Sequence, residues 1–161
     1  MKNGIYDRGK AVAYAHKWAF GRNPAYYDFE EIGGDCTNFA SQCLRAGGGV
    51  MNFTPTFGWY YVNAARRAPA WTGVVYLWNF LTRDKQSAGP VGRPCGLSEL
   101  EPGDIVQLSF DGVTYTHCPV VVSASGTVLL AAHTEDADNR PLYTYPYRAV
   151  RCAHITGVLL P

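Results

Sequence analysis

The chain has little charge, and its positive and negative charges nearly balance. Asp, Glu, Lys and Arg make up 17% of the 161 residues, and the net charge is +1. The longest run of basic residues is the pair Arg66–Arg67. Proteins that bind nucleic acids carry basic surfaces that contact phosphates. We therefore expect no nucleic-acid partner.

Long apolar runs are also absent. No run approaches the ~18 residues of a membrane-spanning helix, so we expect no membrane partner. Residues 1–7 lack the apolar stretch of a signal peptide. We expect a mature or excised domain that acts at the cell envelope or outside the cell, or otherwise a protein that acts in the cytoplasm.

Cysteine pairs of the C-x-x-C type are missing as well. The five cysteines are an odd number, which argues against a disulfide framework and against an ordinary structural zinc site. We expect no metal and no cofactor. At least one thiol then has a chemical role, and the others act as small core side chains.

Apolar residues make up 47% of the chain, enough for one hydrophobic core. No repeat, linker or low-complexity segment divides it, so we expect a single domain over 1–161. Three helices are predicted first, from an Asp7 cap to about Phe20, from Cys36 to 46, and near 71–83. Four strands follow, at 105–110, 118–123, 127–133 and 152–159. Helices followed by antiparallel strands predict an α+β domain.

Cys36 lies at the most informative position of the chain. In the stretch 33–44, GGDCTNFASQCL, a glycine pair makes a turn, Asp35 occupies the position of a helix N-cap, and the thiol falls on the first helical residue. The positive end of a helix dipole stabilises a thiolate, which is the nucleophilic form of cysteine. The charge of Asp35 opposes this, and we expect its cap bond and orientation to outweigh that effect.

Two histidines can be placed relative to one another by strand register. If 124–126 is a three-residue hairpin loop, the numbers of two paired residues add up to 250. His117 then faces His133 across the ladder. A two-residue loop shifts the register by one and puts the two rings on opposite faces. In the first register the imidazoles suit a general base and the group that orients it, beside a cysteine nucleophile.

The triad predicted on this basis is Cys36, His117 and His133. Asp136 and Asn139, in the loop after His133, are alternatives for the third group. His16 is expected on the surface, and His154 receives no role. Cys118 should point into the core. The stretch 47–69, which includes Trp59 and Tyr60, forms either an aromatic binding surface or a cover for the core edge.

Three blocks of the sequence resemble the putative amidase domain family of bacterial, mostly Gram-positive, proteins. The first is 6–27, from the YDR triplet through the RNPAYY segment. The second, DCTNFASQCL at 35–44, is highly specific. The third comprises PGDIV at 102–106, His117 and the AHT triplet at 132–134. The resemblance extends over nearly the whole chain.

The resemblance implies a papain-like fold of the CHAP and NlpC type. It also implies hydrolysis of an amide bond through an acyl-enzyme, with Cys36 as nucleophile, His117 as general base and His133 as orienting group. Many relatives act on cell-wall peptides. The Cys36 N–H and a side-chain donor would form the oxyanion hole, with Tyr27 or Tyr26 as donor.

Asn38 is a further candidate polar group near the nucleophile, although we expect it to bond to backbone in the first helical turn. Trp59 is the candidate substrate platform. Two other functions stay open. One is a catalytically silent module that binds cell-wall fragments or peptides. The other is a zinc site made by Cys36, His117 and His133.

Overall fold

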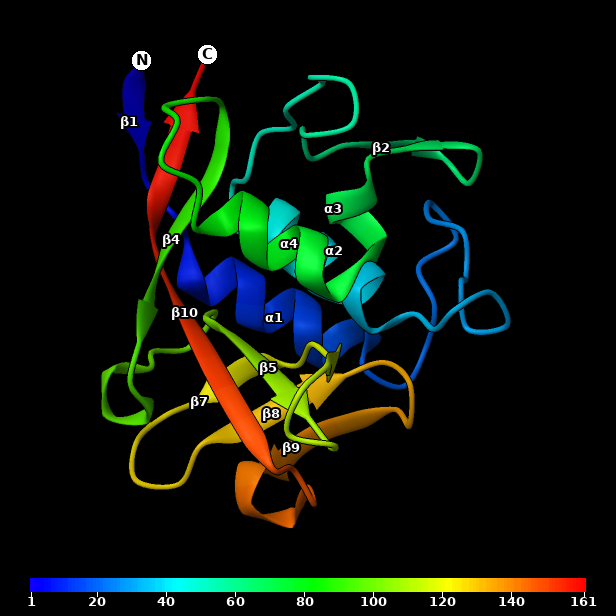
Figure 1. Cartoon of the computed structure of the whole chain (residues 1–161), viewed down its shortest axis with the longest axis vertical. Coiled ribbons are helices and arrows are strands. Elements are labelled where there is room, and N and C mark those ends of the chain that lie inside the picture. Colours follow the sequence, from blue (N-terminus) through cyan, green and yellow to red (C-terminus); the bar gives the residue numbers. More distant parts are fainter.

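The computed structural model describes all 161 residues and has the expected α+β architecture. Its four helices are α1 (Arg8–Trp18), α2 (Cys36–Ala46), α3 (Pro69–Thr72) and α4 (Val74–Leu81). They gather on one side of a curved antiparallel sheet built mainly from the C-terminal half (Figure 1). None of the helices has the length and apolar character that crossing a bilayer requires.

The main sheet has the strand order β1-β10-β5-β7-β8-β9, with β4 added on β10 and β6 on β5. Its strands are β1 (Lys2–Gly4), β4 (Gly89–Cys95), β5 (Ile105–Ser109), β6 (Tyr115–His117), β7 (Val120–Ser123), β8 (Leu129–Ala132), β9 (Ala137–Pro141) and β10 (Ala149–Leu160). A separate hairpin joins β2 (Tyr61–Asn63) to β3 (Arg66–Arg67). Two short 3-10 turns occupy Leu97–Glu99 and Leu142–Thr144.

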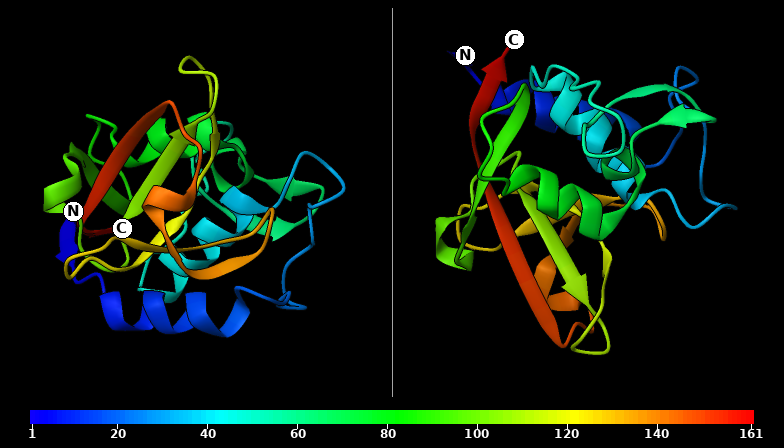
Figure 2. Two further views of the ribbon diagram at one scale, coloured as in Figure 1. Left: turned by 90° about the horizontal axis from the view of Figure 1, so that it is seen from below. Right: turned by 45° about the horizontal axis from the view of Figure 1, so that its top comes forward.

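Strand β10 holds the sheet together because it pairs with β1, β4 and β5. Lys2 lies opposite Leu160 in the β1–β10 ladder. The two termini are therefore neighbours, as Figure 2 also shows.

Helix α1 begins as the sequence predicts. The Asp7 carboxylate accepts a hydrogen bond of 3.0 Å from the Lys10 N–H, which is an N-cap bond. Ala11 and Ala15 are the buried residues of α1. Their side chains are small, so the helix can pack closely against its neighbours. The helix ends at Trp18, slightly before the predicted Phe20.

Helix α2 is the central element. All of its residues from Cys36 to Leu44 are buried, the polar ones included. The Ser41 hydroxyl donates to the Trp71 carbonyl and accepts from the Trp59 indole N–H, both at 3.0 Å. These bonds satisfy polar groups that would otherwise be buried without partners.

The predicted third helix is instead two helices, α3 and α4, separated at Gly73. A Cβ atom at Gly73 would approach the Tyr76 ring to 2.6 Å and the Pro69 carbonyl oxygen to 3.0 Å. The position therefore requires glycine, and the close approach lets α4 start in a new direction.

The PGD turn before β5 ties three elements together. Asp104 is fully buried and accepts hydrogen bonds from Arg8 Nη1 at 2.7 Å, His154 Nδ1 at 2.9 Å and the Ile155 N–H at 2.9 Å. Arg8 opens α1, and the other two donors lie on β10. His154, which received no role from the sequence, is therefore part of a structural network.

Candidate active site

Cys36 lies where the first turn of α2 meets the strand that carries His117. Its thiol points at the Thr116 carbonyl oxygen, 4.0 Å away, and lies 3.8 Å from the Thr37 hydroxyl. Thr116 belongs to β6, so the sulfur lies beside the backbone that immediately precedes His117. The fold thus brings together two residues that are 81 positions apart in the sequence (117 minus 36). No hydrogen bond joins the two side chains.

The predicted cap at Asp35 is wrong. Asp35 occupies the N-cap position, but its side chain makes no capping bond. Instead its Oδ1 accepts from the Phe29 N–H and from the Asn38 amide, both at 2.8 Å. The N–H of Cys36 donates to no acceptor in the protein, which leaves it free for a ligand oxygen.

The thiol of Cys36 is not a stabilised thiolate in this structure. Burial raises its pKa above the ordinary value, and the Asp35 charge raises it further. The Thr37 hydroxyl and the Cys118 backbone act in the opposite direction and do not compensate. The expectation of an activated thiolate at the helix start is therefore corrected, because Cys36 is only 7% exposed and burial disfavours the charged form of the thiol.

His117 ends β6 and faces a cleft of about 380 Å³. The ring of Tyr145 lies 5.6 Å from the imidazole and that of Phe110 lies 6.4 Å from it, measured between ring centroids. Burial, with a smaller contribution from the Arg140 charge, lowers the pKa of His117 to about 4. The imidazole is therefore neutral around pH 7 and can accept a proton.

The predicted pairing of His117 with His133 is wrong. Strands β7 and β8 pair Val120 with Ala131, so the register sum is 251 rather than 250, and β8 ends before His133. His117 pairs instead with Leu108 of β5. Cys118 and Pro119 separate β6 from β7, so the strand predicted over 118–123 begins only at Val120.

Both nitrogens of His133 are committed to other groups. Nδ1 lies 2.5 Å from Asp35 Oδ2, and Nε2 lies 2.8 Å from the Trp18 carbonyl oxygen. The ring also stacks on Phe39, with a centroid distance of 4.1 Å. His133 is therefore part of the framework behind Cys36 and does not contact the His117 ring.

The hydrogen bonds of His133 place a proton on one ring nitrogen. A carbonyl oxygen only accepts, so Nε2 must carry a proton. Hydrogen bonds from His133, Asn38 and the Phe29 N–H outweigh the opposing effect of burial and lower the pKa of Asp35, which is thus a carboxylate and also accepts. Nε2 of His133 therefore donates to the Trp18 carbonyl, and Nδ1 makes a buried hydrogen bond with the Asp35 carboxylate.

The alternative third groups lie elsewhere. Asp136 makes a bidentate pair with Arg22, at 2.9 and 3.1 Å. Asn139 is exposed and adopts a positive φ of 53° within β9. Neither side chain forms a hydrogen bond with the His117 ring.

The remaining candidates are structural in this arrangement. Asn38 donates to the Tyr27 carbonyl at 2.9 Å and accepts from the Trp71 indole, so its backbone partner lies outside the predicted helical turn. The Tyr26 ring packs on Trp71, and the half-exposed Tyr27 ring packs edge-on against Phe29. Neither tyrosine hydroxyl forms a hydrogen bond with Cys36.

Trp59 cannot be a substrate platform as it stands. Its side chain is fully buried and stacks against Trp71 at 4.6 Å, and its indole N–H is bonded to Ser41. Part of the predicted aromatic surface is thus core. Phe57, by contrast, is 83% exposed.

The cleft beside His117 also contains residues that sequence reasoning missed, namely Glu135, Arg140 and Tyr145. Glu135 has a positive φ of 58°, and Arg140 lies over the Tyr145 ring with its Cζ 3.7 Å from the centroid. No sequence pattern marks these residues, because β9 (ADNRP) has no alternation and the 3-10 turn at Leu142–Thr144 has no motif.

The structure contains no site that matches the hypothesis of a bound zinc ion. No group of three His, Cys, Asp or Glu side chains is arranged to hold a metal ion. His133, one of the three proposed ligands, has both ring nitrogens bonded to protein oxygens.

Comparison with known proteins gives two matches. A family model described as a putative amidase domain matches residues 5–155. The uncharacterized protein YhbB of Bacillus subtilis (strain 168) is 34% identical over 140 residues, which is 86% of this chain. The chain spans 44% of the length of that relative. No solved structure matches the chain.

Proposed function

Because the chain belongs to the putative amidase domain family, a membership that indicates action on amides, we propose that it is a cysteine-dependent amide hydrolase. The reaction runs through an acyl-enzyme on Cys36. The substrate is a peptide-like amide, with cell-wall peptide as the favoured class. The observation that carries this proposal is the position of the Cys36 thiol, at a helix start and beside the strand that carries His117.

The proposed reaction uses a neutral base. As the Cys36 sulfur attacks the carbonyl carbon of the substrate, His117 accepts the thiol proton. The resulting oxyanion is received by the free N–H of Cys36. The His117 imidazolium then protonates the leaving amine, and a thioester remains. His117 next takes a proton from water, which attacks the thioester, and the acid departs as the thiol recovers its proton.

The protonation states support this order of events. The pKa of Cys36 is raised and that of His117 is about 4, so the resting pair is thiol and imidazole rather than thiolate and imidazolium. Proton transfer must then accompany the attack on the substrate. This differs from enzymes whose thiolate forms before substrate binds.

His133 has a different role in this proposal from the one that the sequence predicts. Its hydrogen bond with the Asp35 carboxylate fixes the residue that immediately precedes the nucleophile. The Asp35 N–H is held as well, by the Thr134 hydroxyl at 3.2 Å. His133 is therefore a positioning residue, and the catalytic residues are Cys36 and His117.

The fold and the cleft support the class of substrate. A helix-borne cysteine packed against an antiparallel sheet agrees with the papain-like arrangement that we propose. Glu135 and Arg140 place both signs of charge in the His117 cleft, beside the Phe110 and Tyr145 rings. Such a cleft suits peptide-like groups that carry amines and carboxylates.

A silent binding module is the second candidate. It is favoured by the low exposure of Cys36 and by the lack of a hydrogen bond between its thiol and the His117 ring. Such a module would bind cell-wall fragments or peptides without cleaving them.

The test compares wild type with Cys36→Ala and His117→Ala. Purified peptidoglycan fragments and a panel of acylated peptides are assayed for newly released amines, and mass spectrometry searches for an acyl group on Cys36. We expect both variants to lose at least about 10³-fold in turnover. The control variants Cys95→Ser and His16→Ala should retain wild-type rates.

The possible results separate the two candidates. Full activity in Cys36→Ala or His117→Ala would contradict the assignment of the catalytic residues. Saturable binding of fragments by wild type, with no amine release and no acyl adduct, would establish the silent module instead. Circular dichroism melting curves confirm that each variant is folded.

A further inference from the structure

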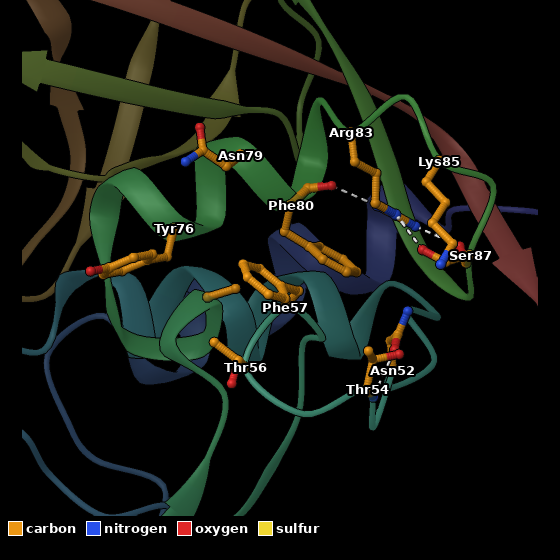
Figure 3. Close-up of a pocket in the computed structure, with 11 residues that line it drawn as sticks. Asn52, Thr54, Thr56, Phe57, Tyr76, Asn79, Phe80, Arg83, Lys85 and Ser87 are labelled. Atoms are coloured by element: carbon orange, nitrogen blue, oxygen red, sulfur yellow. Dashed lines mark hydrogen bonds between the residues drawn. The ribbon is translucent and has the colours of Figure 1, made fainter.

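A second cavity lies outside the His117 cleft, between α4 and the loop that precedes β2 (Figure 3). Its volume is about 460 Å³, which falls within the range of small-molecule sites. Tyr76 and Phe80 of α4 line one wall together with Arg83, which follows the helix. Phe57 lines another wall, and Lys85 and Ser87 close one end. No residue of this cavity lines the His117 cleft.

The walls of the cavity are aromatic. Figure 3 shows the rings of Phe57 and Phe80 beside one another, with Tyr76 farther along α4. Phe57 is 83% exposed and Tyr76 is 60% exposed, whereas Phe80 is part of the core. Large exposed aromatic side chains that gather at a cavity mark a binding surface, because a ligand removes them from water.

One end of the cavity is cationic and has no counter-charge. No carboxylate forms an ion pair with Arg83 or Lys85. Burial lowers the pKa of Arg83 to about 10, which reflects a cation that is partly desolvated without an anion beside it. Asp84 is exposed and does not line the cavity. The field in the cavity therefore favours an anion.

The two cations contribute in different ways. The Arg83 guanidinium donates to the carbonyls of Phe80, Ser87, Ala88 and Pro90, and to the Ser87 hydroxyl. These bonds use its donors, so Arg83 provides charge alone.

Lys85 makes no hydrogen bond or ion pair in the structure and is exposed, so its ammonium group can bind a ligand directly. The Ser87 hydroxyl accepts from Arg83 Nε at 2.8 Å, which leaves its own proton free to donate. An anion at this end would thus meet two donors and the charge of Arg83.

From this combination we infer that the cavity binds a small apolar carboxylate. The carboxylate lies at Lys85 and Ser87, and an aromatic or branched apolar body packs on Phe57 and Tyr76. A free acid and the C-terminal residue of a peptide share this chemistry. The site is separate from Cys36 and does not depend on hydrolytic activity.

The experiment compares an acid with its neutral amide. Isothermal titration calorimetry measures the binding of N-acetyl-L-phenylalanine and of N-acetyl-L-phenylalaninamide to the full chain. We expect the acid to bind at least tenfold more tightly. Lys85→Gln should reduce this preference to below twofold, and Phe57→Ser should weaken the binding of both probes. Cys36→Ala should bind the acid like wild type.

Matched controls test the location of the site. Lys10→Gln and Phe20→Ser change an exposed lysine and an exposed phenylalanine on or beside α1, which does not line the cavity. Neither should alter the affinity for either probe. Equal binding of acid and amide, or a preference that survives Lys85→Gln, would overturn the inference.

The peptide acetyl-Ala-Ala-Phe separates the two sources of ligand. Tighter binding than that of N-acetyl-L-phenylalanine assigns the site to peptide C-termini, because the extra residues then contribute contacts. Weaker binding assigns it to free acids.

Discussion

At the scale of single residues, the reactivity that we propose for Cys36 depends on the state of His117. Burial raises the pKa of the thiol, so the proposed reaction needs an unprotonated imidazole. Arg140 contributes to this condition from the wall of the same cleft, because its charge disfavours a proton on His117. A residue with no sequence signature therefore tunes the base of the proposed reaction.

We expect Arg140→Gln to shift the pH profile of the proposed hydrolysis. In wild type, kcat/KM should fall as the pH drops through about 4, where His117 becomes protonated. Removing the Arg140 charge raises the pKa of His117, so the acid limb should move to higher pH. The measurement is kcat/KM from pH 3 to 9, together with an NMR titration of the His117 ring.

The control for this shift is Arg66→Gln, which removes an exposed arginine on β3. It should leave the acid limb in place. An unmoved limb in Arg140→Gln would show that burial alone sets the pKa of His117. The position of the limb, rather than the height of the profile, is the informative quantity, since Arg140 also lines the cleft.

At the scale of elements, His133 joins the end of α1, the start of α2 and the end of β8. Its contacts are the Trp18 carbonyl and the Asp35 carboxylate, and it directly follows β8. Removing either partner leaves the other buried without its hydrogen bond, which typically destabilises a protein by about 1–3 kcal/mol, and by more when the remaining group is charged. The position of Cys36, the proposed nucleophile, therefore depends on a contact between three elements.

We expect Asp35→Asn and His133→Gln each to lower the free energy of unfolding, and the double variant to lose less than the sum of the two. The coupling arises because the double variant buries no unpaired charge. Urea unfolding at pH 7 measures it. His16→Ala, which removes an exposed partner of Asp138, should change stability by less than about 0.5 kcal/mol.

The same pair gives stability a pH dependence. The pKa of Asp35 is lower in the folded protein than in the unfolded chain. Its contribution to stability is therefore complete above about pH 4 and is lost as the pH falls further. Additive losses in the double variant would contradict the coupling between Asp35 and His133.

The sequence predicts where individual helices begin better than it predicts the tertiary contacts between elements. The Asp7 cap and the start of α2 at Cys36 follow from local chemistry, and both are confirmed. Strand β4 was missed because its sequence, GPVGRPC, is rich in glycine and proline and pairs only through its tertiary context. The sequence does not predict the Asp35–His133 contact, because it joins residues 98 positions apart and His133 lies beyond the end of β8.

At the scale of the whole molecule, two apolar clusters lie within one fold. The larger contains Cys43 and Cys118 among the helices and one face of the sheet, and the smaller contains Cys152. All three thiols are almost fully buried, whereas Cys95 is partly exposed. The rates at which these thiols are modified therefore show whether the two clusters unfold together.

We expect iodoacetamide to modify native protein at Cys95 first and at Cys36 more slowly, with the Cys36 rate rising with pH because burial raises its pKa. Cys43, Cys118 and Cys152 should be protected by at least about 10³-fold relative to unfolded chain, since only global unfolding exposes them. Mass spectrometry of digests assigns each rate, and protein in 6 M guanidinium chloride gives the unprotected rates.

Faster modification of Cys152 than of Cys43 would mean that the smaller cluster opens by itself. Equal protection of the two would mean that the sheet transmits one cooperative transition to both clusters, so that the site around Cys36 is as stable as the core beneath it.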